Sequence, residues 1–145
     1  MILTGSNEFK KIKDSIPLGV NLLAVSKGHK HDSIRKLSGY GQLDFGESRL
    51  QEAILKKIDL SDLTQLRWHF VGTLQKNKVR RVIKEFDFIH SVDSLPLLER
   101  ISRISQEEQK SPNIFLQVKF IEDPNKGGFL NCLLYTSPSP RDGLL

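Results

Sequence analysis

Residues 22–27 read Leu-Leu-Ala-Val-Ser-Lys, a short apolar run that ends in two polar residues. Because the run is short and follows Pro17 and Gly19, it predicts a buried β-strand rather than a helix. A tight turn containing Gly28 comes next, and a helix is predicted over residues 33–37. The chain therefore starts a strand–helix order at residue 22.

The same order of strand and helix continues for another 90 residues or so. Further strands are predicted over residues 43–46, 67–72, 87–92 and 113–120, and further helices over 49–58, 77–86 and 94–108. Strands joined by helices of this length imply right-handed βαβ units and a parallel sheet, which is the α/β class. Both an open doubly wound sheet and the front of a (β/α)8 TIM barrel have this pattern. Residues 26–29 read Ser-Lys-Gly-His and lack the glycine-rich GxGxxG turn, which weakens the doubly wound alternative.

Composition narrows the class of protein. Of 145 residues, 38% are hydrophobic and 27% are charged, so the chain can bury a core and is not compositionally disordered. No run approaches the roughly 20 apolar residues of a membrane span, and the first residues do not resemble a signal peptide. A single cysteine excludes an intramolecular disulfide framework and a multi-cysteine zinc site. These features predict a soluble cytoplasmic protein without a membrane partner.

Lys27 is the residue for which the sequence indicates a chemical role most clearly. It ends the first predicted strand, so its stem is expected in the core and its amine at the carboxyl edge, where parallel α/β folds bind ligands. A desolvated lysine there loses its proton more readily and can attack an aldehyde to form a Schiff base. The alternative is a lysine that merely reaches from a strand end into solvent.

Other polar residues are expected at the same edge. His69 belongs to the third strand, and the alternative for it is a histidine at a strand whose hydrogen bonds are already satisfied by neighbouring residues. Glu47 and Ser48 follow the second strand, where Glu47 could instead be a first-turn acid favoured by the helix dipole. Ser94 follows the fourth strand and could simply be a helix N-cap. Their convergence on one edge favours a ligand site.

The basic residues between 76 and 84 raise the question of nucleic acid. They alternate with apolar residues on the opposite helical face, so an amphipathic surface helix explains them, and no DNA- or RNA-binding motif accompanies them. We therefore expect no nucleic-acid partner. His29 and His31 lack a carboxylate or cysteine cluster at ligand spacing, so no metal site is expected.

Several short motifs together resemble the pyridoxal-phosphate homeostasis protein family, from roughly residue 22 to residue 129. They are Ala24-Val-Ser-Lys27, Phe45-Gly-Glu47, Trp68-His-Phe-Val-Gly72, Leu74-Gln75, Asn77-Lys78, Ser91-Val-Asp-Ser94 and Gln117-Val118. The resemblance implies a fold-type-III barrel like the N-terminal domain of alanine racemase, of which about five of eight strands are present. It also implies that Lys27 holds pyridoxal 5′-phosphate (PLP) as an internal aldimine, with Ser48 and His69 lining the cofactor.

Two positions depart from the family pattern. The family usually reads Gly-Glu-Asn where this chain has Gly46-Glu47-Ser48, which shortens one polar contact near the cofactor. It usually reads Gln-Val-Asn where Lys119 stands, which puts a lysine near the ligand edge. Neither departure removes the Schiff-base lysine.

Residues 132–142 interrupt the strand–helix order. They read Cys-Leu-Leu-Tyr-Thr-Ser-Pro-Ser-Pro-Arg-Asp, which matches one translated frame of a transposon-type sequencing adaptor. We therefore expect residues 1–131 to be the N-terminal part of a PLP-binding barrel and residues 132–145 to be a disordered, non-native tail. The resemblance places the phosphate-binding residues and the partner of the pyridine nitrogen beyond residue 131. Weak or absent cofactor retention is therefore expected of the 145 residues of this chain.

The resulting hypothesis is a cytoplasmic PLP-binding protein of vitamin B6 homeostasis. The resemblance implies a monomeric carrier or regulator without catalytic turnover, with PLP-dependent apoenzymes as possible recipients. The first alternative is a racemase or decarboxylase of the same fold, which would need an added acid or base. The second is a basic RNA-binding module, which would bind in a salt-dependent manner through residues 76–84.

Overall fold

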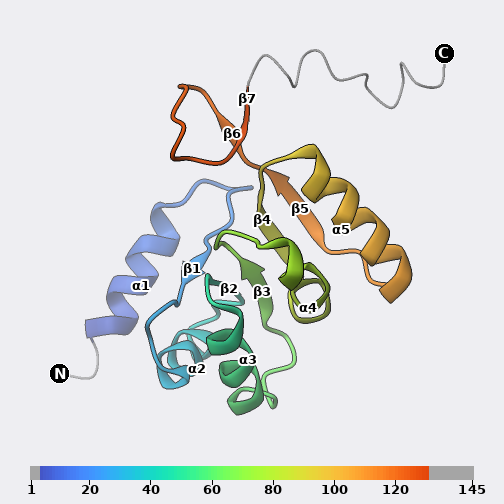
Figure 1. Ribbon diagram of the computed structural model, residues 1–145. Helices are drawn as coiled ribbons and strands as arrows, with labels where there is room; N and C mark the ends of the chain where they lie inside the picture. Colours follow the sequence, from blue (N-terminus) through green and yellow to red (C-terminus); the bar gives the residue numbers. More distant parts are fainter. Residues whose placement is uncertain (1–3, 131–145) are drawn as a thin grey trace. The chain divides into compact units, whose positions relative to one another are not determined.

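The computed structural model describes residues 4–130. The chain divides into two compact units, residues 1–70 and residues 71–145, whose elements are labelled in Figure 1. The predicted non-native tail, residues 132–145, lies outside the described residues. Between residues 4 and 130 no helix is long and apolar enough to cross a membrane.

The first unit is a small parallel sheet with its connecting helices. Its elements are α1 (Thr4–Ser15), β1 (Ala24–Val25), α2 (His31–Gly39), β2 (Asp44–Glu47), α3 (Leu50–Asp59) and β3 (Arg67–Phe70). Strand β2 pairs in parallel with β1 on one side and with β3 on the other. Each crossover between neighbouring strands contains one helix, which is the connection that parallel strands require.

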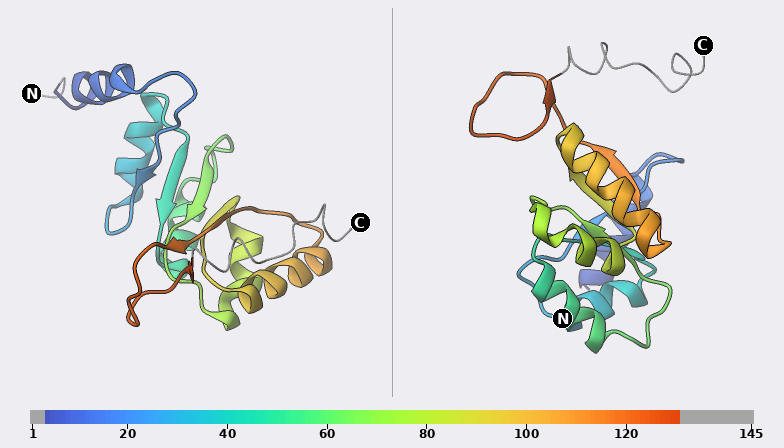
Figure 2. Two further views of the ribbon diagram at one scale, coloured as in Figure 1. Left: turned by 90° about the horizontal axis from the view of Figure 1, so that it is seen from above. Right: turned by 45° about the vertical axis from the view of Figure 1, so that its right-hand side comes forward.

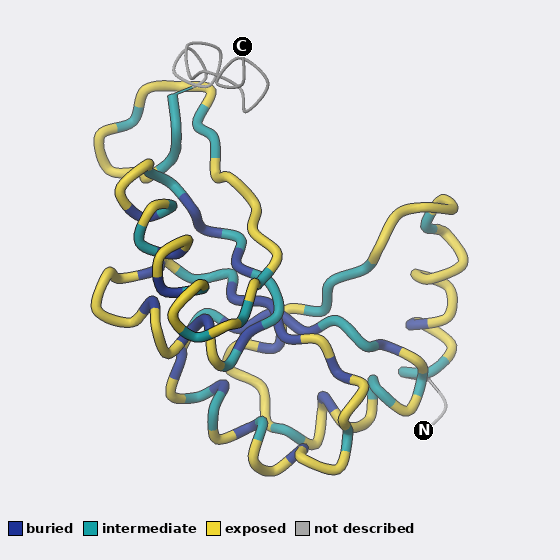
Figure 3. Tube along the Cα trace, turned by 90° about the vertical axis from the view of Figure 1, so that its right-hand side faces the viewer, coloured by how far each residue is buried: buried dark blue, intermediate teal, exposed yellow. Residues whose placement is uncertain are grey.

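The core of the first unit lies between these strands and the helices α2 and α3. Phe45 on β2 and Trp68 on β3 are register partners, with ring centroids 6.4 Å apart, and both are buried. Ile34 of α2 and Ala53 of α3 are buried as well. Helix α1 is mostly exposed, as Figure 3 shows. Phe9 is its buried residue. The sheet and the helices α2 and α3 therefore form the packed part of this unit.

The second unit repeats the helix–strand order. Its elements are η1 (Lys76–Lys78), α4 (Val79–Glu85), β4 (Phe88–Val92), α5 (Leu95–Glu108), β5 (Asn113–Leu116), β6 (Val118–Lys119) and β7 (Phe129–Leu130). Strands β4 and β5 are parallel, and so are the short strands β6 and β7. Helix α5 runs beside β5 in both views of Figure 2.

The two helices of the second unit bury the apolar faces that the sequence predicts. Helix α4 buries Val79, Val82 and Ile83, and α5 buries Leu97, Ile101 and Ile104. The basic residues of α4 lie on its exposed side in ion pairs: Arg80 with Glu107 and Glu108, Arg81 with Glu85, and Lys84 with Glu108. The prediction of an amphipathic surface helix is therefore confirmed.

The predicted α/β class and the parallel strands are confirmed, and two local predictions differ from the structure. Helix α1 was not predicted, because Phe9 and Ile12 are the only large apolar residues between residues 4 and 15. The single strand predicted over 113–120 is interrupted at Gln117. The backbone N–H of Gln117 still donates to Val92 O at 2.8 Å, but its carbonyl accepts from Phe129 N at 2.7 Å, which starts the separate β6–β7 pair.

Candidate functional site

Lys27 lies in a tight turn immediately after β1. The N–H of His29 donates to Ser26 O at 3.0 Å, and Gly28 has a φ of +76°. A positive φ at the third residue of such a turn is the pattern of a type II turn, with Lys27 at the second position. The side chain of Lys27 is exposed. The expectation that its stem lies in the core is therefore wrong, because Ser26 and not Lys27 faces the helices.

The strand register places His69 on a defined face of the sheet. Val25 is the partner of Gly46, and Gly46 is the partner of His69. Since side chains alternate between faces, these three residues share the face opposite the one that packs on α2 and α3. Lys27 lies in the turn after β1 and Ser48 in the bend after β2, so both follow the carboxyl ends of neighbouring strands but lie beyond the paired residues. A common ligand site for Lys27, Ser48 and His69 stays a prediction.

His69 is held by contacts toward the opposite end of the strands. Its Nε2 lies 2.9 Å from Oδ1 of Asp44, the first residue of β2, and Arg67 Nη2 donates to Asp44 Oδ2 at 2.6 Å. Burial raises the pKa of Asp44, but the hydrogen bonds from Arg67 and His69 outweigh it and hold the pKa below its usual value. This geometry matches the alternative of a satisfied histidine at a strand, with its partner on the neighbouring strand β2. A role for His69 in lining a cofactor stays a prediction.

A buried ionic cluster lies on the helix side of the sheet, beneath the Lys27 turn. Glu47 is the last residue of β2 and is completely buried, so the interpretation of Glu47 as a first-turn helix acid is wrong. Its Oε1 lies 2.7 Å from Lys56 Nζ and accepts from Ser26 Oγ at 2.6 Å. The other oxygen, Oε2, has no hydrogen-bond partner among the described residues.

Lys56 is the residue of this cluster that sequence reasoning missed. It lies on α3, where Leu50, Ala53 and Lys56 form the buried face at a spacing of three residues. A lysine in register with an apolar helix face was the signal that could have found it, because lysine is almost never buried without a partner. Glu52, one turn before it on α3, completes the cluster at 2.7 Å from Lys56 Nζ.

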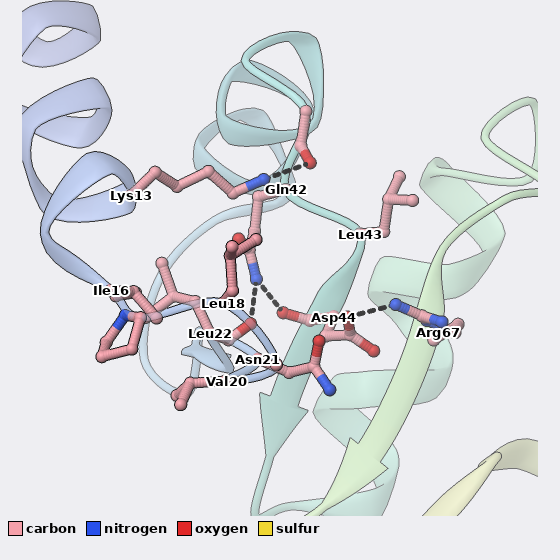
Figure 4. Close-up of a pocket in the computed structure, with 13 residues that line it drawn as sticks. Lys13, Ile16, Leu18, Val20, Asn21, Leu22, Gln42, Leu43, Asp44 and Arg67 are labelled. Carbon is pink, nitrogen blue, oxygen red and sulfur yellow. Dashed lines mark hydrogen bonds and ion pairs between the residues drawn. The ribbon is translucent and has the colours of Figure 1, made fainter.

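A second feature of the first unit is a pocket of about 320 Å³ at the amino ends of β2 and β3. Figure 4 shows Lys13 and the loop residues 16–22 around it, with Gln42 Nε2 donating to Leu22 O and Asp44 O at 2.7 and 2.8 Å. Arg67 and Asp44 close one side through their ion pair. The pocket is at the opposite ends of the strands from Lys27, so it is separate from the predicted site.

The remaining predicted residues lie in the second unit. Ser94 precedes α5 as its N-cap residue but makes no side-chain capping hydrogen bond, and Lys119 is half-buried on β6. In the part of the chain that the structure describes, no group of three histidine, cysteine, aspartate or glutamate side chains is arranged to hold a metal ion.

The fold and the site define a class of protein: an α/β protein with an exposed lysine at the carboxyl end of its first parallel strand. The chain belongs to the alanine racemase N-terminal domain family, whose model matches residues 6–130. Its fold is similar to that of an alanine racemase from Clostridium difficile, with a TM-score of 0.68 and 16% identity over 97% of this chain and 35% of that one. The predicted fold class is thereby confirmed.

Several proteins with higher sequence identity to this chain than the alanine racemase are named for pyridoxal phosphate or contain it. The chain is 40% identical over 121 residues to the pyridoxal phosphate homeostasis protein of Synechocystis, covering 83% of this chain and 56% of that protein. It is 35% identical to the Escherichia coli protein of that name, with 77% and 49% covered. The structure of PipY from Synechococcus elongatus with PLP bound has a TM-score of 0.85 and 43% identity, covering 90% of this chain and 60% of that one. The chain thus spans about half the length of the curated relatives it matches.

Proposed function

We propose that this chain is part of a PLP-binding protein of vitamin B6 homeostasis, which holds the cofactor as a Schiff base on Lys27. The observation that carries the proposal is the placement of Lys27: an exposed residue in a type II turn immediately after the carboxyl end of β1, beside the carboxyl end of β2 that Ser48 follows. The names of the similar proteins and the PLP bound to PipY support the choice of cofactor.

The residues present fit this cofactor chemically. PLP supplies an aldehyde, to which the unprotonated Nζ of Lys27 adds; a C=N bond forms and the carbonyl oxygen leaves as water. Lys27 is exposed to solvent, so an aldehyde can approach it. Ser48, which is half-buried, follows the neighbouring strand and could supply a polar group, and His69 is the third residue proposed to line the cofactor.

We further propose that the protein is a carrier or regulator rather than an enzyme, acting as a monomer in the cytoplasm and delivering PLP to apoenzymes without a nucleic-acid partner. The named relatives support this choice. The racemase or decarboxylase alternative has weaker support, because the alanine racemases are only 16–19% identical to this chain and therefore share the fold alone. No observation favours the RNA-binding alternative, since Arg80, Arg81 and Lys84 are engaged in ion pairs.

Covalent trapping tests the proposal. The chain is incubated with PLP, reduced with borohydride, and digested, and mass spectrometry locates the pyridoxyl group among its lysines. Trapping is suited to this chain because the sequence predicts weak retention of the free cofactor. We expect Lys27 to carry most of the label and Lys27→Ala to lose it.

Lys30 provides a matched control, because it is an exposed lysine three residues after Lys27. Lys30→Ala should leave the labelling of Lys27 unchanged. Equal labelling of Lys27 and the other exposed lysines, or an unchanged yield in Lys27→Ala, would contradict the proposal. The same pair of variants in a longer protein containing residues 1–131 should show the matching difference in visible absorbance.

A further inference from the structure

Both peptide groups that flank Lys27 are hydrogen-bonded to side chains of a single helix, α3. The peptide group before Lys27 contains the carbonyl of Ser26, and the peptide group after it contains the N–H of Gly28. Lys56 Nζ donates to Ser26 O at 2.9 Å, and Gly28 N donates to Glu52 Oε1 at 3.0 Å. The orientations of two successive peptide planes set φ and ψ of the residue between them. They therefore set the direction of the Lys27 Cα–Cβ bond.

The contact before Lys27 is buried and highly connected. The ammonium of Lys56 has three hydrogens and three acceptors, namely Ser26 O, Glu47 Oε1 and Glu52 Oε1, at 2.7 to 2.9 Å. Its side chain is only 7% exposed, so water competes little for these bonds. The Ser26 hydroxyl donates to the same Glu47 oxygen at 2.6 Å. Ser26 is thus fixed through both its carbonyl and its side chain.

The contact after Lys27 involves a residue that otherwise has much freedom. Gly28 has no side chain, and its backbone is exposed to solvent. The hydrogen bond to Glu52 restrains it. The contact with Lys56, and after it this hydrogen bond from Gly28, hold the pKa of Glu52 below its usual value. A charged carboxylate is a stronger acceptor than a neutral one, so the restraint on Gly28 is strongest when Glu52 is ionised.

We propose that Glu52 and Lys56 are positioning residues, which together fix the Lys27 turn and with it the direction in which the Lys27 side chain leaves the backbone. This inference rests on the proposed role of Lys27. Glu52 and Lys56 both belong to α3, the helix that packs on the face of the sheet opposite His69. Fixing the turn in advance removes the cost of ordering it when an aldehyde binds, which is the general benefit of preorganisation.

A purely structural ion cluster would have a different signature. Such a cluster would change the stability of the chain when it is altered, but not the reactivity of Lys27 in the molecules that stay folded. Glu52 is well suited to separate the two roles. Its side chain is 27% exposed, and without it Lys56 keeps both Glu47 and Ser26 as partners, so no buried charge is left unpaired.

The test measures the rate of borohydride-trapped labelling at Lys27 as a function of PLP concentration, normalised to the folded fraction of each variant. Glu52→Ala removes the acceptor for Gly28 N, and we expect the second-order labelling rate at Lys27 to fall about tenfold. Glu52→Gln removes the same charge but keeps an oxygen acceptor, so it should restore most of the rate. The pair therefore separates the hydrogen bond from the electrostatic effect of the carboxylate on the lysine.

Glu99→Ala is the matched control, because Glu99 is an exposed glutamate within helix α5 of the second unit. It should label at the rate of the unaltered chain. Lys56→Met provides a second variant, and those molecules that fold should also label slowly at Lys27. Unchanged labelling in Glu52→Ala, or a loss in Glu52→Gln equal to that in Glu52→Ala, would overturn the positioning role. If the unaltered chain shows no preference for Lys27, the proposed function itself fails, which is a distinct outcome.

Discussion

Replacing Lys56 by methionine is expected to destabilise the first unit strongly. Methionine keeps most of the length and apolar stem of lysine but removes the ammonium. Glu47 would then keep one hydrogen bond, from Ser26, while its carboxylate stays completely buried. Its Oε2 has no partner among the described residues even in the intact cluster. The variant therefore leaves a buried charge without its counterion.

The structure lets the size of this effect be bounded. Removing one partner of a buried ion pair costs about 3–5 kcal/mol, because the remaining charge is uncompensated. A cost within this range is expected for the Lys56–Glu47 pair, because the two side chains are only 7% and 0% exposed and the Nζ and Oε1 atoms are 2.7 Å apart. The pair of Arg35 and Asp62 is bidentate at 2.6 and 2.8 Å but exposed, and such pairs contribute little because water screens them. Arg35→Met is therefore a matched control for loss of a cation.

Urea unfolding followed by the fluorescence of Trp68, which is buried, measures both variants. We expect Lys56→Met to lower the free energy of unfolding by about 3 kcal/mol or more, and Arg35→Met to lower it far less, because water screens the exposed pair. Adding Glu47→Leu to Lys56→Met should recover part of the loss, because the unpaired carboxylate is gone. Equal small losses for Lys56→Met and Arg35→Met would refute the assignment of a buried, energetically coupled cluster.

Three further changes test other parts of the structure. Asp44 has a lowered pKa in the folded chain, so its contribution to the free energy of unfolding is present above its unfolded pKa and is lost as the pH falls through its folded pKa. Between about pH 5 and pH 2 the unaltered chain should therefore lose more stability than Asp44→Asn. Parallel urea-unfolding profiles of the two proteins over this range would contradict this. Gly28→Ala should cost about 1–2 kcal/mol in urea unfolding through its φ of +76° alone, since no atom lies within 4 Å of the added Cβ, and Gly28→Asn should cost less. Phe86→Ala should cost about 3–5 kcal/mol because Phe86 is completely buried, whereas Leu18→Ala, at a fully exposed position, should leave the urea midpoint unchanged.

Most strands and helices could be predicted because their apolar residues follow a clear period. The helix predicted over 94–108 forms as Leu95–Glu108, and the strand predicted over 87–92 forms as Phe88–Val92. The first strand is shorter than expected, with two residues instead of six, because β1 pairs within its unit with β2 alone. Strand boundaries depend on such pairing partners, which the local sequence does not contain.

The candidate site could be predicted only in part. Strand ends can be predicted from sequence, so Lys27, Ser48 and His69 were expected at one edge of the sheet, and Lys27 and Ser48 do follow the carboxyl ends of the neighbouring strands β1 and β2. The contacts around them could not be predicted, because they join residues far apart in the chain: Asp44 to His69, and Lys56 to Ser26. The burial of Glu47 likewise depends on how α3 packs on the sheet.

Because Lys56 is buried and Lys27 is exposed, comparing their rates of chemical modification measures local opening of the structure. An acylating reagent modifies a lysine amine only while that amine is in contact with solvent, as Lys27 is and Lys56 is not. Lys27 should therefore react at the intrinsic rate of the reagent, and Lys56 only during excursions in which α3 separates from β2. The ratio of the two rates gives the free energy of that opening under native conditions, without unfolding the remainder of the chain.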